Sequence, residues 1–188
     1  RWLSNSVVVH ATADSPLGPF TKKETVFGLF SHEPAAQRAP SGEYVLFFTS
    51  YHGAATDAPT CNCSDGSSAS GEQGCEHEPG RGKNKTLFSY MAWATSPDGP
   101  WSEPVVLSSK ALDPQGTVDT NLSPVIMKDG SLLAWTRWDV WTASNWKDPK
   151  TYRDTGQAPA WINMTFWEGE DPFVYRDAKG RWHMISHN

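Results

Sequence analysis

The sequence is short of several features that define other classes of protein. Its 188 residues contain no apolar run near the roughly 18 residues that a membrane-spanning helix needs. Arg1 begins no charged-then-apolar secretory signal. The net charge is only -5, and no block of like charges occurs. A membrane span is therefore not expected, and neither nucleic acid nor an anionic membrane is indicated as a partner. We expect a neutral partner.

Sustained helical periodicity is also missing. Apolar residues instead recur in short β-branched and aromatic runs, such as residues 44–48, which is typical of strands. With 38% hydrophobic and 20% charged residues, the chain suits one globular unit with a core. The sequence predicts an all-β fold.

Cysteine is scarce and confined to one stretch. Cys61, Cys63 and Cys75 all lie in the polar, Gly/Ser-rich residues 54–86. This clustering resembles a surface loop stapled by a disulfide in an oxidising compartment, and the odd count leaves one thiol free or paired elsewhere. A zinc site that includes His77 is the alternative, but the Cys-x-Cys spacing is not the usual one. We expect no metal or cofactor here, with a structural calcium ion left open.

Three N-glycosylation acceptor patterns point to the same compartment. They begin at Asn62, Asn84 and Asn163. A fourth, at Asn121, is discounted because Pro124 directly follows it and restricts the backbone of the acceptor segment. We expect a secreted or cell-surface glycoprotein.

A hairpin motif occurs three times along the chain. Each copy has a proline, a short apolar stretch, a turn glycine and a second strand-like run. The prolines are Pro34, Pro124 and Pro172, and the turn glycines are Gly42, Gly130 and Gly180. A second phrase, which follows a strand each time, occurs at residues 11–20 and 94–101. A weaker copy lies at 141–149, and the strand expected before it, residues 133–135, lies somewhat further away. Four short antiparallel strands per module are typical of a propeller blade.

The repeat divides the chain into parts of one propeller. Residues 1–30 are expected to end one blade, and 31–106 to form a blade that carries the insertion 54–86. Residues 107–160 form a further blade, and 161–188 the inner strands of another. A closed ring needs at least about four blades to hide its sheet edges. We expect the remaining propeller segments, or another chain, to complete the ring.

Three phrases carry a family resemblance. They are Glu170-Asp171-Pro172-Phe173-Val174-Tyr175 with Asp177-Ala178-Lys179-Gly180, Ser96-Pro97-Asp98-Gly99-Pro100-Trp101, and Asn121-Leu122-Ser123-Pro124 with Asp129-Gly130. In these, the chain resembles the five-bladed β-propellers of the superfamily that contains glycoside hydrolase families 43, 32, 62, 68 and 117. The resemblance implies a glycosidase with three acidic residues from successive blades in an axial funnel. It also implies that the first of these acids lies before Arg1, so that this segment holds an incomplete set.

Hairpin geometry predicts which residues face the funnel. The start of a hairpin's first strand and the end of its second lie at the same end of the blade. The expected groups are His32 and Glu33 with Thr49, Asn121 with Arg137, and Glu170 and Asp171 with His187. Trp167 and Trp138 offer flat faces to a sugar ring.

The carboxylates among these residues are the candidate catalysts. Glycosidic cleavage needs one protonated and one ionised carboxyl group. The residue before the repeat proline is Glu33, then Ser123, then Asp171, so the middle blade lacks an acid there and Asp119 is the substitute. The catalytic candidates are Asp171, Glu170, Glu33 and Asp119, and the substrate-binding candidates are His32, Asn121, Arg137, Trp167 and His187.

Purely structural roles are the alternative to these assignments. Glu33 is equally suited to capping the strand entry through backbone hydrogen bonds. Asp129 and Asp177 are expected to be turn residues, and most of the ten tryptophans to pack between sheets.

Three functions therefore stay open. The first is a glycoside hydrolase that acts on a neutral extracellular glycan. The second is a non-catalytic carbohydrate-binding or structural propeller module of a cell-surface or extracellular assembly. The third is protein contact through the insertion.

Overall fold

β-Strands make up nearly all the regular structure of the chain in a computed structural model that describes residues 6–28, 31–51, 87–107, 121–137, 139–157 and 170–187. The all-β prediction is confirmed. In chain order the elements are β1 (Val8–Thr12), β2 (Thr21–Phe27), β3 (His32–Arg38), β4 (Tyr44–Tyr51), β5 (Leu87–Ala94), β6 (Val105–Val106), β7 (Ser123–Ile126), β8 (Leu132–Trp135), β9 (Val140–Ala143), a 3-10 turn (Pro149–Thr151), β10 (Tyr152–Asp154), β11 (Glu170–Arg176) and β12 (Trp182–His187).

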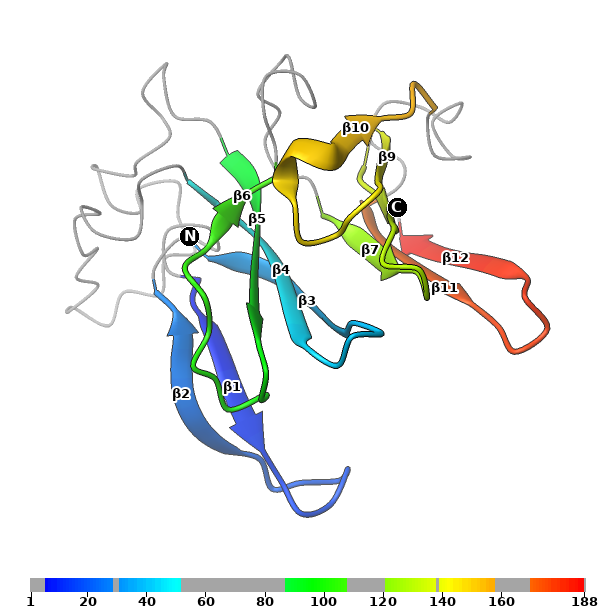
Figure 1. Ribbon diagram of the computed structural model, residues 1–188. Helices are drawn as coiled ribbons and strands as arrows, with labels where there is room; N and C mark the ends of the chain where they lie inside the picture. Colours follow the sequence, from blue (N-terminus) through cyan, green and yellow to red (C-terminus); the bar gives the residue numbers. More distant parts are fainter. Residues whose placement is uncertain are drawn as a thin grey trace, which may run out of the picture. The chain divides into compact units, whose positions relative to one another are not determined.

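The strands form antiparallel sheets in which neighbouring strands are also consecutive in the sequence (Figure 1). Two sheets have four strands, in the orders β3-β4-β5-β6 and β10-β9-β8-β7. The hairpins β1–β2 and β11–β12 form the other two sheets. The chain divides into two compact units, and the hairpin β1–β2 belongs to one while most of β3 and β4 and all later strands belong to the other.

The turn between β11 and β12 has the chemistry that the sequence predicts. Gly180 adopts φ +81, a value open mainly to glycine. Asp177 Oδ1 accepts hydrogen bonds from the backbone N–H groups of Lys179 and Arg181, each at 2.9 Å. In the β7–β8 turn, Asp129 Oδ1 accepts from Ser131 N at 3.0 Å in the same way. Both aspartates are turn residues.

The third strand of the β7–β10 sheet differs from the sequence prediction. The repeat places residues 133–135 before the weaker copy of the second phrase, as its strand. The structure assigns Leu133 to Trp135 to the second strand, β8, and the third strand, β9, lies inside the phrase at Val140–Ala143. The prediction was wrong because the loop between β8 and β9 is short, and Thr136 closes it by accepting the Asp139 N–H at 2.8 Å on Oγ1.

The core lies between the two four-stranded sheets. Buried Val45, Phe47 and Met91 of one sheet belong to the same apolar cluster as Leu132 and Trp141 of the other. Face-to-face packing of this kind removes large apolar side chains from water, the main driving force of folding. Within the cluster, Tyr152 donates its hydroxyl to the Trp146 carbonyl at 2.7 Å, and Trp93 meets Trp146 edge-on with ring centroids 6.2 Å apart.

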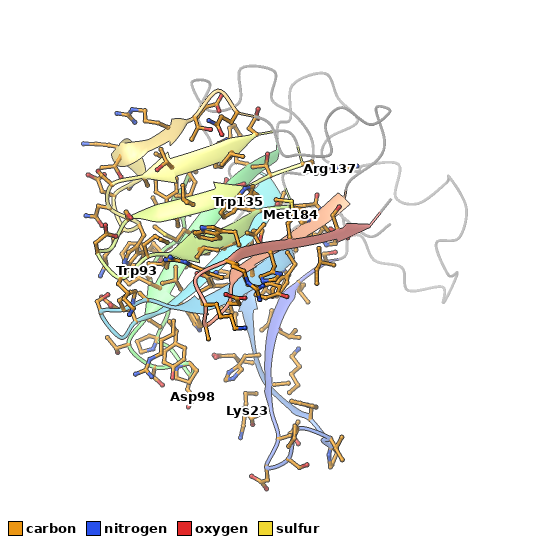
Figure 2. All side chains as sticks on the ribbon, turned by 90° about the vertical axis from the view of Figure 1, so that its right-hand side faces the viewer. Lys23, Trp93, Asp98, Trp135, Arg137 and Met184 are labelled. Atoms are coloured by element: carbon orange, nitrogen blue, oxygen red, sulfur yellow. The ribbon has the colours of Figure 1, made fainter. Side chains whose placement is uncertain are left out.

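The hairpin β11–β12 has two unlike faces. On one face Val174 is buried, and Trp182 packs on Trp135 (labelled in Figure 2) with ring centroids 5.4 Å apart. On the other face Phe173 and Ile185, which pair across the two strands, are 61% and 60% exposed. Among the described residues, no helix is long and apolar enough to cross a membrane.

Candidate functional site

A pocket of about 400 Å³ lies where three hairpins begin. Its lining comes from residues 33–37 of β3, residues 121–124 at the start of β7, and residues 171–174 of β11. The repeat prolines Pro34, Pro124 and Pro172 are all part of this lining. Segments far apart in the sequence therefore meet around one hollow.

Three pocket residues share a rare backbone conformation. Glu33, Asn121 and Asp171 have φ values of 54, 40 and 50, and they are the only non-glycine residues with positive φ in the part of the chain that the structure describes. Left-handed backbone is costly for residues with a Cβ, and residues before proline also favour extended backbone. Such outliers persist where the surroundings enforce them, and they cluster at functional sites.

The strand register corrects the alignment of the repeat. Ser123 pairs with Trp135, and Phe173 pairs with Ile185, at matching distances from the turn glycines Gly130 and Gly180. Asn121 is thus the counterpart of Glu33 and Asp171. The prediction that Ser123 occupies this position was wrong, because the middle hairpin carries its proline two residues later. Counting back from the glycines finds the equivalence in the sequence alone.

A β-bulge accompanies Asp171. Glu170 pairs with His187, but the next pair is Phe173 with Ile185, so β11 has one more residue than β12 between the two pairs. Bulges bend a strand and re-aim side chains, often beside active sites. The bulge brings Asp171 to the pocket lining at the end of the hairpin where His187 also lies.

Two hydrogen bonds hold the pocket carboxylates. Asn121 Nδ2 donates to Asp171 Oδ1. Thr49 Oγ1 lies 3.4 Å from Glu33 Oε2 and donates to it. The second contact agrees with the prediction that Thr49 returns to the same end of its hairpin as Glu33. Asn121 itself is only 5% exposed, whereas Asp171 is exposed, so a buried amide holds a carboxylate that is open to solvent.

Two further side chains of the pocket lining, Gln37 and Ser123, join neighbouring sheets. Gln37 Nε2 donates to the Pro124 carbonyl, and its Oε1 accepts the Ile126 N–H at 3.1 Å. Ser123 Oγ accepts the Val174 N–H at 2.9 Å. These side chains satisfy strand-edge groups of the adjacent hairpin, and thereby fix the three strand starts against one another. Sequence reasoning missed both, because Gln and Ser in a strand give no signal of their partners.

The remaining predicted residues fall into three groups. His32 and Arg137 are described, but neither is part of the pocket lining. Figure 2 labels Arg137, and His32 Nδ1 lies 3.1 Å from Ser6 Oγ. For Glu170 and His187 only the strand positions are described. Outside the described residues lie Asp119, Trp138, Trp167, the sequons at Asn62, Asn84 and Asn163, and the cysteines Cys61, Cys63 and Cys75.

No described residues form a group of three or more His, Cys, Asp or Glu side chains arranged to hold a metal ion. The structural calcium ion that the sequence left open stays untested. The polar side chains of the pocket lining are the carboxylates of Glu33 and Asp171, the carboxamides of Asn121 and Gln37, and the hydroxyl of Ser123.

Antiparallel four-stranded sheets that pack face to face, with first strands that meet at one hollow, define this chain as part of a β-propeller. Among solved structures it is similar to the alpha-L-arabinofuranosidase from Lactobacillus brevis, with a TM-score of 0.57 and 11% identity over 93% of this chain and 53% of that chain. The chain therefore has a β-propeller fold like that of this arabinofuranosidase, and it spans about half of that protein's length.

Two further solved structures are similar over smaller shares of their length. The GH43 protein BlXynB from Bacillus licheniformis matches with a TM-score of 0.46 and 16% identity, over 81% of this chain and 24% of that one. The GH43B protein of a Bacteroides ovatus xyloglucan PUL matches with a TM-score of 0.44 and 15% identity, over 99% and 26%. No protein-family model and no curated protein sequence matches this chain.

Proposed function

We propose that this chain is part of a glycoside hydrolase that cleaves a neutral glycan in the pocket. The observation that carries the proposal is that Glu33 and Asp171, from separate hairpins, line the same hollow of about 400 Å³. Small-molecule sites usually measure about 300 to 1,000 Å³. Glu170 and Asp119 remain additional candidate acids, and His32, Arg137, Trp167 and His187 candidate sugar contacts.

The chemistry needs two carboxyl groups in different states. One donates a proton to the leaving glycosidic oxygen, and the other attacks the anomeric carbon or activates the water that does so. Glu33 and Asp171 are the proposed pair. Two carboxylates with no basic side chain among the lining residues repel an anionic ligand, which favours a neutral sugar.

Hydrolysis by the full chain tests the proposal. The panel contains aryl glycosides, with the α-L-arabinofuranoside included because of the similar arabinofuranosidase, and neutral polysaccharides. Glu33→Gln and Asp171→Asn are each expected to lower kcat/KM by about 10² to 10⁴. The matched controls Glu103→Gln and Asp14→Asn, at exposed positions outside the pocket lining, keep wild-type rates. No product from any substrate, with the protein folded by near-UV circular dichroism, contradicts the proposal.

A specific observation favours a second candidate, glycan binding without cleavage. The middle hairpin carries Asn121 where its neighbours carry Glu33 and Asp171. A carboxamide neither donates nor accepts the proton that cleavage moves. Glycan-array binding that survives Asp171→Asn, without hydrolysis in the panel above, favours this candidate.

We also propose that the protein acts outside the cell. Support comes from the sequons at Asn62, Asn84 and Asn163 and from the cysteine-rich insertion. Expression in a secreting eukaryotic host is expected to yield a product whose mass falls on treatment with an N-glycosidase. An unchanged mass argues against this localisation.

The ring is proposed to be completed by further propeller sheets, in the same polypeptide or in another chain. The exposed Phe173 and Ile185 on the outer face of β11–β12 support this, because propeller sheets pack on both faces.

A further inference from the structure

Asn121 carries an oxygen that the fold leaves unsatisfied. The residue is only 5% exposed, and Oδ1 is buried with no hydrogen-bond donor in reach from any residue that the structure describes. Buried polar atoms are nearly always hydrogen-bonded, so an orphan in a native protein marks a place for a water or a ligand. The orphan belongs to a residue of the pocket lining.

The amide orientation follows from its second contact. Asn121 Nδ2 donates to Asp171 Oδ1. A flipped amide would set Oδ1 against the carboxylate oxygen, with two acceptors facing each other. The left-handed backbone at Asn121, with φ 40, further restricts the side chain. Oδ1 is therefore held as a fixed acceptor.

The other polar side chains of the lining are acceptors or are already engaged. Gln37 is occupied by Pro124 and Ile126, and Ser123 Oγ accepts the Val174 N–H. The lining contains no Lys, Arg or His. The carboxylates of Glu33 and Asp171 add only acceptors when ionised. A ligand that satisfies Asn121 Oδ1 must bring a donor, and hydroxyl groups are the neutral donors of sugars.

We propose that Asn121 determines specificity by accepting a hydrogen bond from one sugar hydroxyl at Oδ1, while its Nδ2 holds Asp171 in place for the neighbouring hydroxyl. The ligand class is a sugar with two adjacent free hydroxyls, bound through Asn121 and Asp171. This assignment deepens the proposed function and rests on the same pocket. Asn121 is a positioning residue toward Asp171 and a direct contact toward the sugar.

Binding is the readout, so that cleavage is not needed. The probes are the methyl glycosides of L-arabinose, D-xylose and D-fructose and their monodeoxy analogues, titrated into the full chain labelled with ¹⁵N-asparagine. The Asn121 side-chain amide is assigned by its disappearance in Asn121→Asp. The expected result is a shift of the Asn121 resonances with at least one parent sugar. Removal of one particular hydroxyl, or of its neighbour, weakens that binding about tenfold.

Two variants separate the roles of the side chain. Asn121→Gly removes the acceptor and tolerates the positive φ, so discrimination between the parent and the deoxy analogue should disappear. Asn121→Asp keeps an acceptor for the first sugar hydroxyl but replaces the donor to Asp171 with an oxygen, which no longer holds that carboxylate in place. Discrimination between sugars with and without the neighbouring hydroxyl should therefore be lost first. Asn145→Asp is the matched control, since Asn145 is exposed and its Oδ1 accepts the Lys147 N–H.

The outcomes divide between the two proposals. Hydrolysis without any deoxy discrimination, or discrimination unchanged in Asn121→Gly, overturns the role of Asn121 and leaves the hydrolase standing. Hydroxyl-selective binding without hydrolysis supports the proposed role of Asn121 and contradicts the proposal that the protein is a hydrolase. Shifts of the Asn121 amide by CaCl₂ alone, with no response to sugars, overturn the inference in favour of a cation. No binding and no cleavage overturn both.

Discussion

At the scale of one residue, the side chain of Gln37 hydrogen-bonds to backbone groups at the edge of β7, as a neighbouring strand would. β7 is the last strand of its sheet, so its outer edge has free backbone groups. The side-chain amide of Gln37 covers this edge, because it donates to the Pro124 carbonyl and accepts the Ile126 N–H. The start of β7, which carries Asn121 into the pocket, is thereby held against β3.

Gln37→Glu tests this contact at nearly constant shape. The carboxylate still accepts the Ile126 N–H but faces the Pro124 carbonyl without a donor. We expect the free energy of unfolding at pH 7 to fall by about 1 to 3 kcal/mol. The missing donor also raises the pKa of the new carboxyl, so protonation in acid should restore part of the loss. Urea unfolding at pH 7 and at about pH 4 measures both effects.

The control is Gln157→Glu, at an exposed position. It should change stability little at either pH. A Gln37→Glu protein as stable as wild type at pH 7 would show that the bridge contributes nothing.

Asn121 illustrates the limit of residue-scale prediction. The sequence identifies it as a funnel residue, yet the proline pattern aligns the wrong residue with Glu33 and Asp171. Its equivalence depends on strand register, and its orphan oxygen depends on which groups of distant strands come near. No local pattern encodes the second property.

At the scale of elements, the β11–β12 turn is organised around one carboxylate. Backbone hydrogen bonding from Arg181, followed by the Arg181 and His183 side chains, lowers the pKa of Asp177 to about 2 from an ordinary 3.8. Arg181 Nη2 lies 2.7 Å from Asp177 Oδ2. A carboxyl whose pKa is lowered by folding stabilises the fold above its unfolded pKa, and this contribution is lost as the pH falls.

The stabilisation by Asp177 should therefore be complete above about pH 4 and disappear toward pH 2. The melting temperature of the wild type should fall as the pH is lowered over this range, and in Asp177→Asn we expect this fall to be smaller. Asp14→Asn serves as the control and should keep the wild-type dependence. Identical pH profiles for wild type and Asp177→Asn would mean that the turn does not depend on this ionisation.

The sequence predicted the turns well at this scale. Asp-Gly and Lys-Gly pairs specify hairpin turns through the backbone freedom of glycine and the short reach of aspartate, which act within a few residues. It misplaced β9, because strand boundaries around a short loop depend on pairing rather than on local composition. The bulge in β11 was likewise not foreseen, since it depends on the match to β12.

At the scale of the whole molecule, the outer face of β11–β12 exposes apolar side chains to solvent. Phe173 and Ile185 are adjacent across the hairpin and mostly exposed, with Tyr175 beside Phe173 at a ring-centroid distance of 5.7 Å. In a propeller this face packs on a neighbouring sheet.

A double substitution, Phe173→Thr with Ile185→Thr, tests whether this face is free in the 188-residue chain. Exposed side chains contribute little to stability, so the unfolding free energy should change by no more than about 0.5 kcal/mol. Fluorescence of a hydrophobic dye should fall, because the apolar patch is lost. A large loss of stability would mean that the face is already covered, for example by self-association, which light scattering detects.

The sequence by itself determined the all-β class, the repeated hairpins and the propeller fold, because strand periodicity and turn chemistry are local properties of the chain. Only the tertiary structure decided that, of the predicted funnel residues, Glu33, Asn121 and Asp171 line the pocket whereas His32 and Arg137 do not, and that Asn121 keeps a buried oxygen unpaired. These features arise where three strand starts converge, through a bulge, left-handed backbone and bridging side chains. Their partners are distant in the sequence, so no local pattern specifies them.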